Sequence, residues 1–346
     1  MRNVFYFKNI GLIGGCESWF YYLSRLYKNM VIYYRVGSPE QIKRLARNVE
    51  VHRYKEGETI ECDRFFCCYG PDIIDNVNAK EYYHVIHCDY KKVWFSPILH
   101  PKFDHYIAVS KLAGESFKEI TGIDYILLYN PVDIDMPKVE KYNDGKLHLI
   151  SATRLTKEKG LARMQKLGTM LDASGIDYVW EIYTNKQRQF VGNKVIYKDP
   201  KMDIIEEIAK ADYLVQLSDC EAFCYSIVES LCVGTPVIAT DLPVLKELGV
   251  NEKNAFICDF NMSNVNIQEI AKKPLKVAYK PPKSEWNKYL DNNSNYDPNE
   301  LIKVKCKRAM YLIEEDIHTI RGEIKEIKRY RASELECKDY VEILWN

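Results

Sequence analysis

The sequence predicts an α/β protein with two Rossmann-like domains, each a doubly wound parallel sheet, which face a cleft and precede a small β-rich appendage. Three observations support this prediction. Strand-like runs alternate with helical segments up to residue 122, the alternation restarts at residue 147, and the tail from residue 299 holds short alternating runs. Such alternation is typical of right-handed βαβ units, in which helices cover both faces of a parallel sheet.

The first half of the chain supplies one full set of alternating elements. Aromatic and β-branched runs predict strands at 3–7, 30–36, 64–70, 82–88 and 105–110. Helices are expected at 17–28, 39–48 and 111–122. The connector "YNPVDIDMPKVEKYNDG" follows, and its Pro, Asp and Gly residues are typical of a loop. We place the first domain at residues 1–135.

The second half repeats the pattern. Strands are expected at 147–153, 178–184, 194–198, 213–218 and 236–240, and helices at 160–174, 204–211 and around 225–234. We place the second domain at residues 146–284 and a crossover segment at 285–298. Because ligands bind outside the carboxyl ends of parallel strands, the cleft between the two domains is the expected site.

The tail, residues 299–346, is expected to form the appendage. Its alternating runs predict short strands at 301–313, 318–330 and 339–345. One alternative stays open, because the Glu/Lys spacing over 313–336 also suits a single helix with i,i+4 pairs. The appendage is a candidate for oligomerisation.

Composition excludes several classes of protein. The formal net charge is zero with acids and bases interspersed, which argues against a nucleic-acid-binding protein but leaves room for a local basic patch on a lipid-facing surface. The 11 cysteines are scattered without a C-x-x-C pair, so buried thiols are expected rather than disulfides or a zinc site. No signal peptide and no membrane-spanning run is apparent, so we predict a cytoplasmic protein.

Two carboxylates in "SDCEAFCYSIVESLCVGTPVIATD" are the first candidate site residues. Glu221 falls in a strand-to-helix loop and Glu229 about one turn into the helix, about 80° apart around its axis. The unpaired N–H groups at the start of that helix favour an anion. A ligand with a central diphosphate and polyols at both ends, such as a nucleotide-sugar, would fit. The alternative is that both acids are ordinary solvated side chains.

Basic and glycine residues follow two other predicted strands. Arg154 and Lys159 in "ISATRLTKEKG" lie where they could neutralise a diphosphate, although loop cations are often simply solvated. Gly14 and Gly15 follow the first strand and would allow close approach of backbone to a ligand, although a tight turn explains them equally well.

Two histidines lie near the end of a further strand, in "YYHVIHCDY". His84 and His87 point to opposite faces there and cannot chelate one metal together. His87 is expected at the edge of the cleft, where a functional and a structural role are equally open, and His84 is expected to be a packed structural residue.

Taken in order, five segments resemble the retaining GT-B glycosyltransferases of the family 4 group, also called glycosyl transferases group 1. They are "GGCES", "YIAVSKLAGESFKEITGI", "LLYNPVDID", "ISATRLTKEKG" and the stretch that holds Glu221 and Glu229. The resemblance covers roughly residues 1–291. It implies an acceptor domain followed by a donor domain, and transfer of a hexosyl or N-acetylhexosaminyl group from a UDP-sugar or similar compound to an acceptor hydroxyl, with retention at the anomeric carbon.

The resemblance also implies roles for individual residues. Glu221 would contact the sugar hydroxyls, Glu229 the ribose, Arg154 and Lys159 the diphosphate, and His87 the reacting centre. The remaining residues expected to contact the nucleotide-sugar are Gly14, Gly15, Ala222, Phe223, Cys224, Tyr225 and, near the base, Lys198.

Two features of the sequence qualify this resemblance. "KDP" follows Lys198 where the family often has a glycine, and Cys224 replaces a common glycine. No metal or cofactor is expected, and Asp133 and Asp135, which mimic a D-x-D metal motif, are interpreted as structural. The acceptor (a glycan, lipid-linked, protein or polyol) stays open, as do an epimerase and a non-catalytic nucleotide-sugar-binding scaffold as alternative functions.

Overall fold

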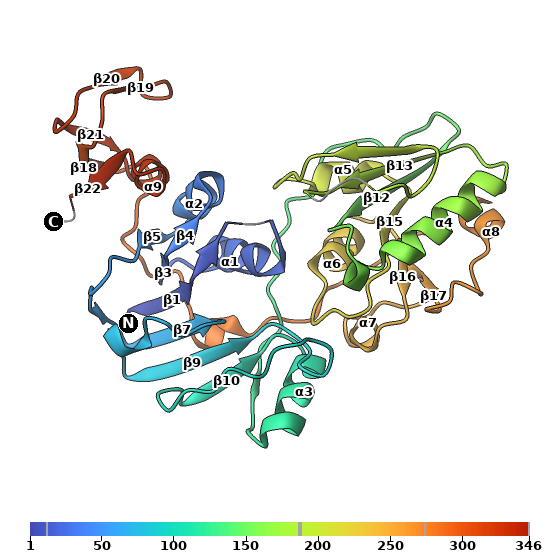
Figure 1. Cartoon of the computed structure of the whole chain (residues 1–346), viewed down its shortest axis with the longest axis horizontal. Coiled ribbons are helices and arrows are strands. Elements are labelled where there is room, and N and C mark those ends of the chain that lie inside the picture. Colours follow the sequence, from blue (N-terminus) through green and yellow to red (C-terminus); the bar gives the residue numbers. More distant parts are fainter. Residues whose placement is uncertain (12, 186–188, 273–274, 345–346) are drawn as a thin grey trace.

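The structure is a computed structural model that describes residues 1–11, 13–185, 189–272 and 275–344. Figure 1 shows two units built on separate sheets and a third, smaller unit at the C-terminal end of the chain. We call the unit up to Leu128 the N-lobe and the unit from Leu147 to Lys272 the C-lobe. None of the helices in the described ranges is long and apolar enough to cross a membrane.

The N-lobe contains a seven-stranded sheet in the order β11-β10-β9-β7-β1-β3-β5, and all neighbouring strands are parallel. The strands are β1 (Asn3–Phe7), β3 (Met30–Tyr34), β5 (Glu50–Arg53), β7 (Arg64–Cys68), β9 (Glu81–Ile86), β10 (His105–Ala108) and β11 (Ile126–Leu127). The chain starts at β1, moves outward through β3 and β5, and then returns to β7. The strand order therefore reverses between β1 and β7, which is a topological switch point.

Local sequence explains the helices of the N-lobe, which are α1 (Gly15–Leu26), α2 (Pro39–Ala46) and α3 (Lys111–Thr121). The Ser38 and Ser110 side chains cap α2 and α3. Each hydroxyl accepts a hydrogen bond from the backbone N–H of the residue three positions later in the chain. Gly122, at a φ of 73°, ends α3 in the left-handed conformation. The small elements are β2 (Asn9–Ile10), β4 (Val36–Gly37), β6 (Ile60–Glu61), η1 (Ile74–Asn76) and β8 (Val77–Asn78).

Six parallel strands form the sheet of the C-lobe, in the order β14-β13-β12-β15-β16-β17. They are β12 (Leu147–Ala152), β13 (Tyr178–Tyr183), β14 (Val195–Lys198), β15 (Tyr213–Gln216), β16 (Val237–Thr240) and β17 (Ala255–Cys258). This order is the Rossmann order, with its switch point between β12 and β15. The connecting helices are η2 (Lys157–Lys159), α4 (Leu161–Ala173), α5 (Ile205–Lys210), α6 (Tyr225–Cys232), α7 (Pro243–Glu247) and α8 (Ile267–Lys272).

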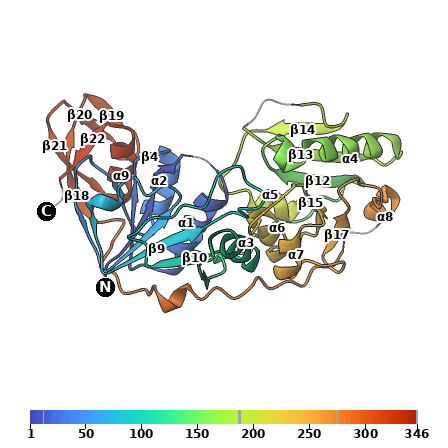
Figure 2. The same ribbon diagram turned by 60° about the horizontal axis from the view of Figure 1, so that its bottom comes forward.

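After the C-lobe the chain returns to the N-lobe, as the orange segment in Figure 2 shows. Trp286, in η3 (Trp286–Lys288), is fully buried against Phe5 and Trp19, with ring centroids 6.1 and 5.4 Å away. The carbonyl of Asp291 accepts hydrogen bonds from the backbone of Lys28 and Asn29. The core of the N-lobe is therefore completed by a segment far away in the sequence.

The C-terminal appendage combines two small antiparallel sheets with one helix. Its elements are β18 (Leu301–Cys306), β19 (Met310–Leu312), β20 (Ile317–Thr319), β21 (Ile324–Lys328), α9 (Arg329–Cys337) and β22 (Val341–Ile343). The alternative of one helix over 313–336 is wrong, because Gly322, at a φ of 87°, separates two strands there. Helix α9, which the strand prediction missed, packs beside α2, and Lys43 forms ion pairs with Glu314 and Glu334.

The predicted fold class is confirmed, since two parallel α/β sheets precede a β-rich C-terminal unit. Strand β5 was not predicted, because its sequence, EVHR, is short and polar. The elements after Thr240, which are α7, β17 and α8, were not predicted either.

Candidate functional site

An ion pair lies at the switch point of the C-lobe. The Nζ atom of Lys159, which follows β12, donates a hydrogen bond to Oε1 of Glu221, which follows β15, over 2.6 Å. The same oxygen accepts hydrogen bonds from Ser218 Oγ at 2.7 Å and Gln216 Nε2 at 3.1 Å. Burial lowers the pKa of Lys159, but the attraction of the Glu221 carboxylate is stronger than this effect, so the pKa of the lysine is raised. The pair thus holds opposite charges at the edge where α/β sheets bind ligands.

Gly160 explains how Lys159 reaches this position. Its φ is 76°, and a Cβ atom added there would lie 1.7 Å from the carbonyl oxygen of Leu217. Only glycine allows the turn before α4 to touch the end of β15 so closely.

Arg154 lies near the ion pair but is not part of it. Its side chain is 52% exposed and pairs with Glu158 at 3.6 Å. Its charge still opposes protonation of Lys159, so the two cations are neighbours. The structure therefore brings Lys159 and Glu221 into contact, and it leaves Arg154 at the surface beside them.

The start of α6 has an unusual backbone. Cys224, directly before the helix, has a φ of 62° in the left-handed region, which favours glycine. Ala222, Phe223, Cys224 and Tyr225 are all buried, and burial raises the pKa of Cys224 to about 12. The turn between Glu221 and α6 therefore has the shape that a glycine would adopt readily, although a cysteine occupies it.

Glu229 of α6 contacts the N-lobe. Tyr22 Oη of α1 donates a hydrogen bond of 2.8 Å to Glu229 Oε1. Burial raises the pKa of Glu229, and Tyr22 and Arg44 partly oppose this. The alternative of a solvated helix-surface acid is therefore wrong for Glu229, whose side chain is buried between the lobes.

The N-terminal ends of α1 and α6 meet where the two lobes touch, and we call this contact between Gly15, Tyr22, Tyr225 and Glu229 the seam. A Cβ atom added at Gly15 would lie 4.0 Å from the Tyr225 ring. That ring also stacks on Tyr22, with centroids 5.5 Å apart, and its hydroxyl donates to the carbonyl of Pro131. Gly14 is the extended residue before α1, and no side chain caps that helix. Because the first N–H groups of a helix have no partner within the helix, two such ends lie near each other here.

His87 lies behind this seam. Its ring lies 5.0 Å from Trp19 and 6.0 Å from Tyr69, and burial lowers its pKa to about 3. Its Nε2 atom is buried and has no hydrogen-bond partner among the described residues. His84 is also buried, against Phe103, with a pKa lowered to about 4, in agreement with its predicted packing role. Both imidazoles are therefore neutral at neutral pH.

Sequence reasoning missed Tyr22 and Asp89. Asp89 is buried just after His87, and its Oδ1 accepts a hydrogen bond of 3.0 Å from the backbone of Lys91. Burial raises the pKa of Cys88 to about 12, with smaller contributions from Asp89 and from Cys220 of the C-lobe, so this loop lies close to the residue before Glu221. The "HCD" sequence was the available signal for Asp89; no sequence signal marks Tyr22.

Two other predicted features lie apart from the ion pair. Lys198, at the carboxyl end of β14, pairs with Glu181 at 2.6 Å, and no hydrogen bond or ion pair in the described ranges joins it to Glu221 or Glu229. Asp133 and Asp135 both pair with Arg25, at 2.7 and 2.9 Å, which agrees with their interpretation as structural residues.

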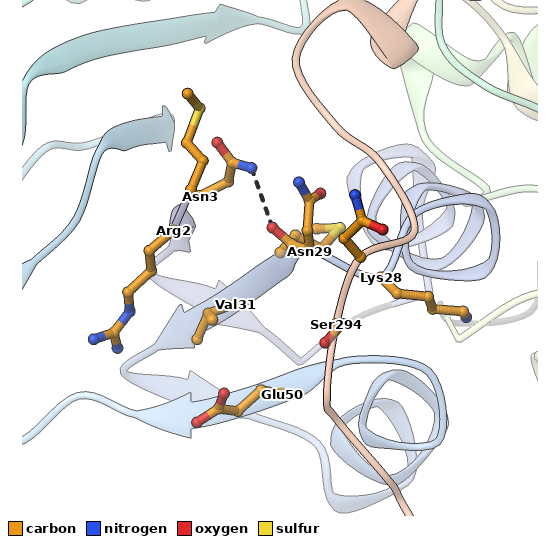
Figure 3. Close-up of a pocket in the computed structure, with 10 residues that line it drawn as sticks. Arg2, Asn3, Lys28, Asn29, Val31, Glu50 and Ser294 are labelled. Atoms are coloured by element: carbon orange, nitrogen blue, oxygen red, sulfur yellow. Dashed lines mark hydrogen bonds between the residues drawn. The ribbon is translucent and has the colours of Figure 1, made fainter.

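A cavity of about 280 Å³ lies at the opposite end of the N-lobe (Figure 3). Its lining includes Asn3, Met30 and Glu50, which are the first residues of β1, β3 and β5. Asn3 Nδ2 donates to the carbonyl of Asn29 there. The cavity thus opens at the amino ends of the strands, away from the edge that carries Lys159 and Glu221.

A family model matches part of the chain. Residues 133–285, the segment that holds Lys159, Glu221 and Glu229, match the family model "Glycosyl transferases group 1". Among curated protein sequences, none is significantly similar to the chain.

Similar solved structures share the fold. HepE of Anabaena in complex with UDP-glucose has a TM-score of 0.60 at 15% identity, over 78% of this chain and 92% of that one. The lipopolysaccharide outer core galactosyltransferase WaaB has a TM-score of 0.51 at 15% identity, over 78% and 88%. TarM, with a TM-score of 0.47 at 16% identity over 60% of this chain, is matched over only 46% of its own length. The first two similarities show that the fold is GT-B.

Proposed function

We propose that the protein is a retaining glycosyltransferase that moves a hexosyl or N-acetylhexosaminyl group from a UDP-sugar to an acceptor hydroxyl without a metal ion. One observation carries the proposal. The Lys159–Glu221 ion pair lies at the switch point of the C-lobe, at the seam where the N-termini of α1 and α6 meet. Support also comes from the match of residues 133–285 and from UDP-glucose in the HepE structure.

The ion pair suits a ligand that carries both a diphosphate and hydroxyl groups. When the ligand binds, Lys159 would exchange part of its contact with Glu221 for a diphosphate oxygen, and Glu221 would accept hydrogen bonds from the sugar. Arg154, half exposed beside Lys159, has room to turn toward the same phosphates. Both partners of the pair thus keep charged or hydrogen-bonded neighbours throughout.

Departure of the diphosphate places negative charge on the leaving oxygen. Lys159 and the N–H groups at the start of α6 would lie near that charge and need little rearrangement, and Arg154 would turn toward it from the surface. Removing one such group costs about 100- to 1,000-fold in rate in well-studied enzymes. Lys159→Ala is expected to fall in that range.

The N-lobe residues have supporting roles in this proposal. His87, whose imidazole is neutral, would offer a hydrogen bond to the sugar rather than a positive charge. Gly14 and Gly15 would let the start of α1 approach the ligand. Glu229 would bind the ribose after Tyr22 releases it, and Lys198 would lie toward the base.

The test measures UDP release and product formation with a panel of UDP-hexoses and UDP-N-acetylhexosamines, with and without candidate acceptors. We expect turnover with at least one of these UDP-sugars. The glycosidic linkage of the product should have the same anomeric configuration as the UDP-sugar. Lys157→Ala is the matched control for Lys159→Ala, because Lys157 lies exposed in the same turn. Formation of an epimer without acceptor would overturn the proposal in favour of an epimerase. Tight binding of every UDP-sugar without any turnover would favour a scaffold protein.

A further inference from the structure

The segment between β9 and β10, residues 87–104, contains no helix or strand. Connections this long without secondary structure are uncommon and are usually either functional or disordered segments. Trp94 in this segment is 96% exposed, although tryptophan is normally among the most buried residues on average. Leu99 in the same segment is 52% exposed. The segment thus presents apolar side chains that no described part of the chain covers.

Buried residues on both sides hold the exposed part in place. Tyr90 is buried against Phe117, with ring centroids 6.1 Å apart, and its backbone N–H donates to Ser116 Oγ. Phe103 is buried against His84, at 5.1 Å. Among the described residues, the ring of Trp94 pairs with one other ring, that of Phe95, with centroids 5.6 Å apart. The fold therefore presents Trp94 and Leu99 on an anchored loop rather than on a frayed end.

The loop is basic in a protein whose formal net charge is zero. Residues 90–103 include Lys91, Lys92 and Lys102 and contain no Asp or Glu. Lys91 pairs with Glu119 of α3, and Lys102 lies 3.9 Å from Asp75. Lys92 is exposed and forms no ion pair with any described residue. Apolar side chains and uncompensated positive charge therefore occur together in one short loop.

We propose that residues 90–103 dock reversibly on an anionic lipid surface. Lysines near a membrane are attracted to anionic headgroups, and tryptophan favours the interface between headgroups and acyl chains. Both requirements are met here by neighbouring residues. His87 and Asp89, directly before the loop, lie beside the candidate site, so docking would bring that site to the membrane surface. The consequence that the acceptor is membrane-resident rests on the proposed function, whereas docking itself does not.

Tryptophan fluorescence offers a direct test of docking. Trp19, Trp180 and Trp286 are fully buried, and replacing Trp345, outside the described residues, by Phe leaves Trp94 as the exposed reporter. Vesicles of phosphatidylcholine with phosphatidylglycerol are added to this full-length protein without any nucleotide-sugar. We expect a blue shift of the emission and co-sedimentation with the vesicles, and neither with phosphatidylcholine alone.

Variants identify the surface responsible. Trp94→Ala should abolish co-sedimentation, and Lys91→Gln with Lys92→Gln should weaken it about 10- to 30-fold. The matched control is Ile313→Ala, because Ile313 is 81% exposed in the appendage and should not affect docking. In the absence of vesicles, circular dichroism and release of UDP should be unchanged in Trp94→Ala.

Four results would overturn docking. They are no binding to anionic vesicles, equal binding to neutral vesicles, loss of binding in Ile313→Ala but not in Trp94→Ala, and a blue shift caused by a soluble oligosaccharide with no vesicle binding. The last result would identify Trp94 as a sugar-stacking platform instead. Vesicle binding by a protein without transferase activity would leave docking intact and would refute only the proposed function.

Discussion

The hydroxyl of Tyr22 in the N-lobe donates a hydrogen bond of 2.8 Å to the carboxylate of Glu229 in the C-lobe. The two rings of Tyr22 and Tyr225 stack beside it. Tyr22 thus occupies the carboxylate that the proposed function assigns to the ribose. Binding of a nucleotide would have to replace this contact between the lobes with one to the ligand.

Replacing Tyr22 by Phe should therefore change stability and binding in opposite directions. Glu229 would lose a hydrogen-bond donor while buried, so the free energy of unfolding should fall by about 1–3 kcal/mol. The ribose would no longer compete with Tyr22, so the Kd for UDP should fall by up to about tenfold. Urea unfolding and titration calorimetry measure the two effects. Tyr21→Phe, on the same helix, is the control, and weaker UDP binding without a loss of stability would contradict the competition.

Glu229→Gln should stabilise the protein at neutral pH while weakening UDP binding. The folded-state pKa of Glu229 is raised by burial, so on raising the pH the carboxyl ionises in the unfolded chain before it does so in the folded protein. The contribution of Glu229 to stability is therefore present below its ordinary pKa and is lost as pH rises through the raised value. Glutamine keeps the acceptor for Tyr22 without the charge, so a gain of about 1 kcal/mol is expected at neutral pH.

The measurement for Glu229→Gln is thermal unfolding of both proteins between acidic and neutral pH. The gain should shrink toward acidic pH, where Glu229 is protonated in both states. A gain in stability that is largest at acidic pH would show that folding lowers the pKa of Glu229 instead of raising it.

Gly160→Ala should be far more damaging than the same change at another left-handed glycine. Gly160 and Gly175 have φ values of 76° and 74°, but only at Gly160 would a Cβ atom meet backbone, the Leu217 oxygen at 1.7 Å. Gly175→Ala should cost about 1–2 kcal/mol from its φ alone. Gly160→Ala should cost more and also lower UDP affinity, because Lys159 would move away from Glu221. If urea unfolding gave the same loss of stability for Gly160→Ala and Gly175→Ala, and Gly160→Ala bound UDP with unchanged affinity, the contact with Leu217 would relax easily.

Cys224 should tolerate glycine better than valine. The left-handed backbone at Cys224 costs an L-residue about 1–2 kcal/mol, which glycine avoids. Cys224→Gly should therefore keep the stability within about 1 kcal/mol despite the lost buried thiol, whereas Cys224→Val should lose at least about 2 kcal/mol because its side chain is β-branched. Urea unfolding distinguishes the two variants. A stable Cys224→Val protein would mean that the turn before α6 can adopt another backbone conformation.

The sequence predicted the sheets, and it predicted that Lys159 and Glu221 would lie near each other, because both depend on local patterns. Alternating strands and helices fix the two sheets, and both residues follow strands on either side of one switch point, where loops must converge. Their roles in binding and turnover stay predictions that the variants above address.

Contacts between segments far apart in the sequence could not be predicted in the same way. From the sequence, Tyr22 is interpreted as a core residue of an amphipathic helix. Only the packing of α1 against α6 brings it to Glu229. The burial of Trp286 in the N-lobe and the docking of α9 beside α2 have the same origin. The left-handed backbone of Cys224 was not predicted, because a cysteine by itself gives no sign of positive φ; the available signal was that Cys224 replaces a common glycine.

Titration calorimetry with UDP tests the central claim most directly, because it asks whether a nucleoside diphosphate occupies the seam that Lys159 and Glu221 mark. We expect the native protein and Lys157→Ala to bind UDP with equal affinity, and Lys159→Ala to bind at least about tenfold more weakly, as a charge-assisted hydrogen bond of about 1.5–3 kcal/mol implies. Undiminished binding by Lys159→Ala, or no binding of UDP by the native protein, would contradict the account.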